Sequence, residues 1–217
     1  MAEATAYQFR IALRRISPKI WRRLQLLSTQ SLADLHFSIQ LVMGWTDEFQ
    51  HRFVIRNHRL GISRPGGLLL FGNPREMRLE QFEFRADERF AYEYNFFDEW
   101  ELEIRFEGAT IADPRYAYPR CVAGAQRAPA EDCGGPEPFM ERWQRDPKQV
   151  RAAHDRSTVI RLATLVKHRG LDARGLVERA REILRRRSLA AFDPAEANCQ
   201  LQHYARAGHL TDSGAEE

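Results

Sequence analysis

Two cysteines and a histidine are the side chains in this sequence best suited to bind a metal. Cys121 and Cys133 lie in a glycine- and proline-rich stretch at residues 116–138, and His51 follows an apolar, helix-like segment. Thiolates at close spacing with a nearby histidine suit zinc, but a structural zinc site needs four ligands. The alternative is a glycine-rich turn whose cysteines are small buried hydrophobic residues. We expect no bound metal and no cofactor, with zinc as the open alternative.

A second group of reactive side chains is acidic. Asp98, Glu99 and Glu101 cluster between two strand-like runs. Paired carboxylates can act in acid–base catalysis or bind a hard cation. The alternative is a solvated turn. A metal-dependent enzyme would need these groups, His51 and the cysteine stretch to converge in one cleft.

Basic residues gather in two places. Near the N-terminus these are Arg14, Arg15, Lys19, Arg22 and Arg23. In the C-terminal half, the residues that we predict to bind nucleic acid or a protein partner are Arg174, Arg179, Arg181, Arg185, Arg186 and Arg187. Clustered arginines on an amphipathic helix pair can bind phosphates or a partner protein, and the alternative is a solvated face with ordinary helix ion pairs.

One amphipathic helix, expected at residues 31–43, organises the rest of the chain. Apolar residues recur along it at three- and four-residue spacing, at Leu32, Leu35, Ile39, Val42 and Met43. This spacing places them on one face. Ser31 can cap the start of the helix with Asp34 in the capping-box position, and Gly44 can end it in the left-handed conformation.

Strict alternation of apolar and polar residues predicts strands. Such runs occupy residues 7–13 and 20–26, which we expect to pair, and a further strand begins at 53–55. The clearest hairpin joins residues 90–96 to residues 100–106, and its aromatic face is expected to cover the helix. Together these elements predict an α+β fold, with an antiparallel sheet packed on an amphipathic helix and a C-terminal helical extension.

The second half of the chain is less regular. We expect a long loop at 116–138 and a short helix at 139–145. Two helices are predicted at 159–168 and 176–187, and a last helix runs from 193 to 204.

Composition limits the class of protein. The chain has 217 residues, a formal net charge of +3 and 43% hydrophobic residues, so a real core is expected and the charge alone does not require nucleic acid. Three cysteines, with no signal-peptide pattern, favour a reducing cytoplasm. No apolar run reaches the length of a membrane span, so we expect no membrane association.

Several motifs together resemble the plasmid pRiA4b ORF-three-like family, which includes resolvase-like passenger proteins of insertion elements. The similar stretches are YQFRIALRRISPKIWRR, SLADLHFSIQLVMGW, His51-Arg52-Phe53, FAYEYNFFDEWELEI, YPRCVAGAQRAPAEDCGG and FDPAEANCQL. The resemblance implies a compact α+β domain with an antiparallel sheet covering a helix. It divides the chain into a family domain at 1–146 plus 188–205, a basic helical insertion at 147–187 and a flexible tail at 206–217.

The family pattern also has polar positions that this chain lacks. Cys121 and Cys133 match its first and third cysteines, whereas the second falls on Ala128, and a histidine often found two residues before His51 is Phe49 here. An Arg-x-Ser recombinase motif is matched only superficially at residues 15–17, because Pro18 follows and no helix-turn-helix completes a resolvase.

We therefore expect a cytoplasmic, non-enzymatic binding or accessory protein of a plasmid, phage or mobile element. It would act through a protein partner or nucleic acid, in an oligomeric state that the sequence does not define. The rival interpretation is a metal-dependent enzyme that uses the Cys121–Cys133 loop, His51 and the 98–101 tip.

Overall fold

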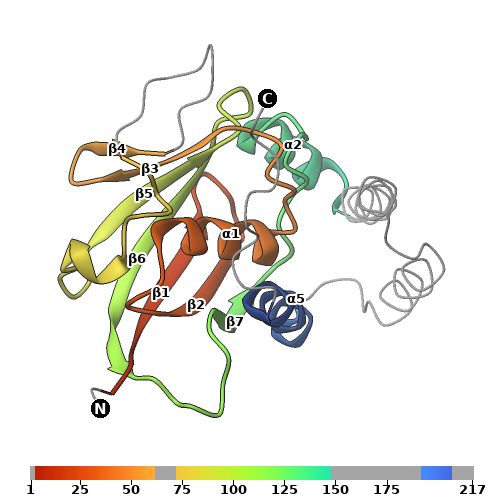
Figure 1. Cartoon of the computed structure of the whole chain (residues 1–217). Coiled ribbons are helices and arrows are strands. Elements are labelled where there is room, and N and C mark those ends of the chain that lie inside the picture. The colour runs from red at the N-terminus through yellow and green to blue at the C-terminus, as the bar shows by residue number, and fades with distance from the viewer. Residues whose placement is uncertain (1–2, 62–71, 148–191, 207–217) are drawn as a thin grey trace, which may run out of the picture.

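The computed structural model describes residues 3–61, 72–147 and 192–206, which form one antiparallel sheet with helices against it (Figure 1). The sheet has seven strands in the order β4-β3-β5-β6-β1-β2-β7. The strands are β1 (Thr5–Leu13), β2 (Trp21–Leu27), β3 (His51–Ile55), β4 (His58–Leu60), β5 (Arg89–Tyr94), β6 (Trp100–Ile111) and β7 (Arg120–Ala125). The helices are α1 (Leu32–Met43), the 3-10 turn η1 (Leu79–Phe82), α2 (Pro136–Arg145) and α5 (Pro194–Arg206). The predicted α+β class is confirmed.

Helix α1 starts and stops where its capping residues require. The Ser31 hydroxyl accepts a hydrogen bond from the backbone N–H of Asp34, and the Asp34 side chain accepts one from the N–H of Ser31. This reciprocal pair is the predicted capping box. Gly44 ends the helix with φ of 73°, a left-handed conformation that glycine adopts without steric cost.

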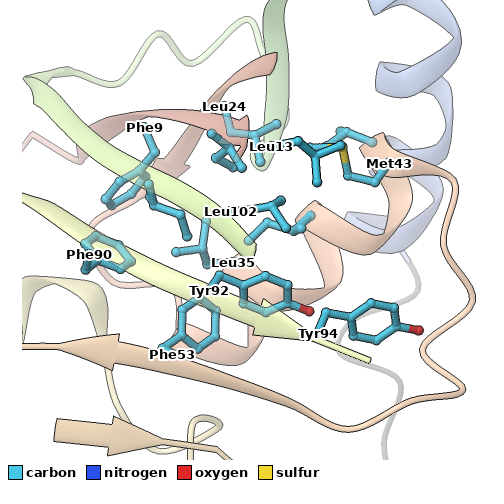
Figure 2. Close-up of a cluster of buried hydrophobic side chains, with 14 of the residues drawn as sticks. Phe9, Leu13, Leu24, Leu35, Met43, Phe53, Phe90, Tyr92, Tyr94 and Leu102 are labelled. Carbon is cyan, nitrogen blue, oxygen red and sulfur yellow. The ribbon is translucent and has the colours of Figure 1, made fainter. Parts of the chain in front are cut away.

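The core lies between α1 and one face of the sheet (Figure 2). The predicted apolar stripe of α1 is buried, and so are the inward residues of the strands, including Phe9, Leu24, Tyr92 and Leu102. The β5–β6 hairpin is confirmed, and its Tyr92 hydroxyl reaches His36 on α1. The aromatic face of this hairpin therefore packs on the helix, as expected.

The stretch at residues 116–138 differs from the prediction of a long loop, because it contains strand β7. This strand pairs with β2 at the edge of the sheet, with an irregularity between Arg23 and Leu24. Its sequence, RCVAGA, has too little alternation of large apolar residues to be recognised as a strand. Helix α2 also starts earlier than predicted, at Pro136, where proline suits the first helical turn.

Helix α5 lies against the edge strand and α1. The Asn198 side chain accepts from the backbone N–H of Cys121 at 2.6 Å and donates to its carbonyl oxygen at 2.6 Å. Tyr204 donates to Asp34 at the start of α1. An amide side chain thus occupies the position of a neighbouring strand, and the edge of β7 is capped at this residue.

Other predictions fall outside the described residues. These are the two helices at 159–168 and 176–187, and most of the proposed tail at 206–217. The division of the chain into a family domain and an insertion stays a prediction. Among the helices of the described part of the chain, none has the length and apolar character needed to cross a membrane.

Candidate functional site

Four arginines face one another across adjacent strands on the outer face of the sheet. Arg10 on β1 is directly opposite Arg23 on β2 and Arg105 on β6, and Arg105 is opposite Arg89 on β5. Directly opposed residues point to the same side of a sheet, while neighbours along a strand, such as Phe9, point to the other. We call Arg23, Arg10, Arg105 and Arg89 the arginine row.

The arginine row is accessible to solvent. The side chains of Arg23 and Arg105 are each 34% exposed, and that of Arg89 is 58% exposed. Like charges directly opposite one another destabilise a sheet, by roughly 0.2–1 kcal/mol for a pair. Such a row is therefore unfavourable for folding unless other groups, or an anionic ligand, offset the repulsion.

Carboxylates offset part of this repulsion. Arg23 contacts Glu107 at 2.6 Å, Arg89 contacts Glu103 at 3.5 Å, and Arg105 contacts Asp87. These pairs are partly exposed, and exposed ion pairs contribute only about 0–1 kcal/mol. A guanidinium group has five N–H donors, so a carboxylate partner leaves donors available for a further anion.

Arg10, in the middle of the row, is held differently. Its guanidinium carbon lies 5.0 Å from the ring centroid of Trp21, and that of Arg23 lies 5.5 Å from the same ring. Within the described part of the chain, the Nε atom of Arg10 is buried and has no hydrogen-bond acceptor. Trp21 thus orders two neighbouring guanidinium groups, and one of them retains an unsatisfied donor.

Three of the other predicted basic residues near the N-terminus, Arg14, Arg15 and Arg22, have intramolecular partners. Arg14 pairs with Glu101, and Arg15 pairs with Glu137 at 2.9 Å. Arg22 is only 2% exposed and donates to the carbonyl oxygens of Val42, Trp21 and Ala125. Of the five predicted N-terminal residues, Arg23 is the one in the arginine row.

Arg22 shows why a basic residue in a strand need not be a surface residue. Burial lowers the pKa of its guanidinium to about 9, which still leaves it charged at neutral pH. The ring of Phe192, next to α5, stacks at 3.7 Å from its guanidinium carbon. Arg22 therefore links the inner side of β2 to β7 and to the C-terminal segment. The predicted binding residues from Arg174 to Arg187 all lie outside the described residues.

The candidate metal ligands from the sequence lie in three separate places. Cys121 is on β7 beside Asn198, Cys133 lies next to α2, and His51 starts β3 against α1. Burial raises the pKa of both thiols, so both are protonated at neutral pH. Neither property favours a shared thiolate site with His51.

The carboxylates of the hairpin tip also have separate partners. Asp98 accepts a hydrogen bond from the N–H of Gly134 at 2.8 Å, whereas Glu99 and Glu101 pair with Arg15 and Arg14. A Cβ atom at Gly135 would lie 2.2 Å from the carbonyl oxygen of Asp98, so the glycine-rich stretch packs tightly on this tip. These contacts join the hairpin tip to the glycine-rich stretch and to Arg14 and Arg15.

His51 instead belongs to a cluster with His36 and Asp47. Ligand atoms of these three residues all lie within 4.8 Å of one another. The His36 Nε2 atom lies 3.0 Å from Asp47 Oδ1, and the two imidazole rings stack with centroids 3.5 Å apart and planes at 11°. His36 comes from α1, His51 begins β3, and Asp47 lies in the turn between them. We call this group the His–Asp–His cluster.

Buried polar side chains surround the His–Asp–His cluster. The Nδ1 atom of His36 lies 2.8 Å from the hydroxyl of Tyr92, which also accepts from Gln40 at 2.8 Å. The side-chain amide oxygen of Gln40 accepts from the backbone N–H of Asp47. Burial raises the pKa of Tyr92 well above its usual value, so this hydroxyl stays protonated and cannot act as a phenolate nucleophile.

Glu131 fixes the turn that carries Asp47. Its carboxylate is fully buried and accepts from the backbone N–H and hydroxyl of Thr46 and from the hydroxyl of Tyr94. Its backbone carbonyl accepts from Asn95 and Trp100. The 116–138 stretch thus reaches across the sheet and holds the segment between α1 and β3.

Sequence analysis missed the arginine row and two members of the His–Asp–His cluster. The row depends on strand register, which alternation alone does not supply. His36 offered a signal, because it is a polar residue next to Leu35 in a helix expected to be largely buried. Asp47 offered only its place in a turn.

These features define an α+β protein with a single large antiparallel sheet, an outer sheet face that carries the arginine row, and a buried polar cluster. The chain belongs to the family of plasmid pRiA4b ORF-3-like proteins, whose model matches residues 5–160. The expected family is confirmed, while the resemblance of the stretch at 192–201 lies beyond this match and stays a prediction.

Two further proteins are similar to this chain. Uncharacterized protein y4hQ from Sinorhizobium fredii is 27% identical over 139 residues, which cover 64% of this chain and 71% of that protein. The fold is also similar to that in the crystal structure of the protein of unknown function MM3350 from Methanosarcina mazei Go1. The match has a TM-score of 0.63 at 24% identity, and it covers 90% of this chain and 98% of that chain. The second likeness supports the fold.

Proposed function

We propose that this protein acts by binding rather than by catalysis, as an accessory protein of a plasmid, phage or mobile element, and that its outer sheet face binds the phosphate backbone of nucleic acid. The observation that carries the proposal is the arginine row, four guanidinium-bearing side chains on adjacent strands of one sheet face. Arginine is the side chain best matched to phosphate, because its planar fork donates two parallel hydrogen bonds.

The dimensions of the arginine row suit a polyanion. Neighbouring strands lie about 4.8 Å apart, so four opposed arginines span about 14 Å. One strand of a duplex advances ~3.4 Å for each phosphate, so this span corresponds to roughly four steps from one phosphate to the next. The contacts would be to the backbone, and the predicted binding is therefore largely independent of base sequence.

The rival enzyme interpretation has less support. It requires the Cys121–Cys133 loop, His51 and the hairpin tip to converge, yet these groups have separate partners. A protein partner with an acidic surface is the other ligand that could use the same charges.

The first experiment is a fluorescence-anisotropy titration of the full chain with labelled single-stranded DNA, RNA and duplex DNA, at about 50 and about 200 mM salt. We expect binding that weakens steeply with salt. Arg10→Gln and Arg105→Gln should each weaken it and reduce the salt slope, by about 0.7 per lost contact on a single strand. Arg145→Gln on α2 makes the same charge change at an exposed position away from the row and should bind as the wild type does.

A second set of variants separates the two basic regions. Replacing Arg185, Arg186 and Arg187 together with alanine tests the region predicted from sequence, whose loss should also weaken binding if that region holds phosphates. Equal affinity of Arg10→Gln and Arg145→Gln would reject the sheet face as the binding surface. No binding to any nucleic acid at low salt would reject the proposal, and the outer face would then be pursued as a docking surface for a protein.

A further inference from the structure

We propose that His36, Asp47 and His51 form a binding site for one divalent transition-metal ion of the zinc class. Two imidazole nitrogens and a carboxylate oxygen are a donor set that binds Zn²⁺, Co²⁺, Ni²⁺ and Fe²⁺. In the described part of the chain, these are the three such residues whose ligand atoms all lie within 4.8 Å of one another. The site is separate from the arginine row and does not depend on it.

Local sequence brings the three ligands together. His36 lies in the first half of α1, Asp47 lies in the turn that follows the helix, and His51 is the first residue of β3. Asp47 adopts a left-handed backbone conformation with φ of 59°, which is uncommon for a residue other than glycine. The Gln40 side chain and the Thr46–Glu131 hydrogen bonds hold this turn in place. Unusual backbone conformations that the surroundings enforce concentrate at binding sites.

The ring of His36 is already held through its other nitrogen, Nδ1, by the hydroxyl of Tyr92. In metal sites, the imidazole nitrogen that does not bind the metal is usually hydrogen-bonded, which fixes the tautomer and the ring orientation. With a metal on His36 Nε2, the ring proton would move to Nδ1, which lies 2.8 Å from the Tyr92 hydroxyl and could donate to it, whereas without a metal a proton on Nε2 can donate to Asp47. Tyr92 is in turn held by Gln40, so it is a positioning residue for the site.

Access to the site is from the Asp47 side. The Asp47 side chain is 31% exposed, while that of His36 is 2% exposed and His51 is buried as well. An ion can therefore reach Asp47 from solvent, and the two imidazoles lie on the buried side of the site. Three protein ligands leave a fourth, solvent-facing position for water.

Metal binding requires one change in the present arrangement. An imidazole lone pair lies in the plane of its ring, and two rings stacked 3.5 Å apart at 11° cannot both direct a lone pair at the same ion. One ring must turn. A turn of either ring opens the His36–His51 stack. Loss of the His36–His51 stack is thus a signature of binding that a purely structural histidine pair would not show.

The test is a titration of the full chain with Zn²⁺ and with Co²⁺. Calorimetry measures the binding of both ions, and visible absorption detects bound Co²⁺. We expect the wild type to bind one ion. Asp47→Asn should bind it at least tenfold more weakly, because the charged ligand is gone. Asparagine keeps an oxygen that can accept from His36 and tolerates the left-handed conformation, so this variant should fold. Glu48→Gln, an exposed neighbour, is the matched control and should bind as tightly as the wild type.

Two further measurements separate this site from adventitious binding at cysteines or other histidines. Tyr92→Phe should weaken Co²⁺ binding roughly 10- to 100-fold, because the partner of His36 Nδ1 is lost. The NMR signals of the His36 and His51 rings should shift on Zn²⁺ addition as the stack opens. The inference is overturned if no ion binds at one equivalent, if Asp47→Asn binds as tightly as Glu48→Gln, or if both ring signals stay unchanged in the metal-saturated protein.

Discussion

The two faces of the central sheet carry opposite chemistry on the same strands. Phe9 on β1 is fully buried among aromatic rings on the inner face, while Arg10, the next residue, stacks on Trp21 on the outer face. The inner face is ordered by apolar burial under α1, which is non-directional and tolerates many sequences. On the outer face, charged side chains lie opposite one another on neighbouring strands. These side chains do not stabilise the fold as the buried apolar residues do.

This difference indicates what each face is for. Apolar residues facing a helix need no further explanation than the stability of the core. Four arginines opposite one another repel one another, and their carboxylate partners offset only part of that repulsion. Substitutions on the inner face should therefore lower stability and leave ligand affinity unchanged. Substitutions on the outer face should lower ligand affinity and leave stability nearly unchanged.

The largest effect expected is from Phe9→Ala. Removal of a buried aromatic side chain costs about 3–5 kcal/mol of unfolding free energy. Arg10→Gln should change stability by no more than about 1 kcal/mol, since it loses a cation–π contact but also a like-charge neighbour and an unsatisfied donor. Urea denaturation of the two variants measures this, and similar losses for both would show that the outer face is structural as well.

A smaller loss of stability is expected from Tyr94→Phe. The Tyr94 hydroxyl donates to the buried carboxylate of Glu131, and burial, aided by this bond, raises the pKa of Tyr94. Removing the donor leaves a buried carboxylate short of one hydrogen bond, at a cost of about 1–3 kcal/mol. Tyr116→Phe, at an exposed ring, is the control and should be neutral. If the two variants unfold at the same urea concentration, the Glu131 network does not stabilise the fold.

The same contrast explains how much the sequence revealed. The helix with its capping box, the β5–β6 hairpin and the pairing of β1 with β2 follow from local patterns, and all are present. The arginine row does not follow from them, because Arg89 and Arg105 come together only through strand register. Strand β7 was missed because its support comes from β2 and from Asn198, 77 residues away, rather than from its own alternation.

The candidate metal site was missed for a related reason. His51 was recognised as a ligand type, but the cysteines assigned to it lie elsewhere, on β7 and beside α2. Its neighbours in the structure, His36 and Asp47, look like an ordinary helix residue and an ordinary turn residue in the sequence. Their convergence depends on how Glu131, far along the chain, holds the turn at Thr46.

The smallest effect expected is a gain rather than a loss. Glu107 accepts hydrogen bonds from Arg23 and Gln8, so Glu107→Gln removes a carboxylate from the outer face and frees Arg23. A partly exposed ion pair of this kind is worth about 0.2–1 kcal/mol, so nucleic-acid affinity should rise roughly 1.5- to 5-fold. Anisotropy at low salt measures the gain, and unchanged or weaker binding would argue against phosphate contacts at Arg23.

Protonation of Glu107 in acid should remove the same carboxylate charge as Glu107→Gln, and its effect can be measured as a change in stability. Burial alone would raise the pKa of Glu107, but the hydrogen bonds from Arg23 and Gln8 lower it on balance. A carboxyl group with a lowered pKa in the folded state stabilises the protein above its unfolded pKa of about 4.3, and this contribution is lost as pH falls through the folded value. The wild type should therefore lose more stability than Glu107→Gln between neutral pH and about pH 3, in urea denaturation at matched salt. Parallel losses in the two proteins would mean that the carboxylate does not hold Arg23, and the expected gain in binding would lose its physical basis.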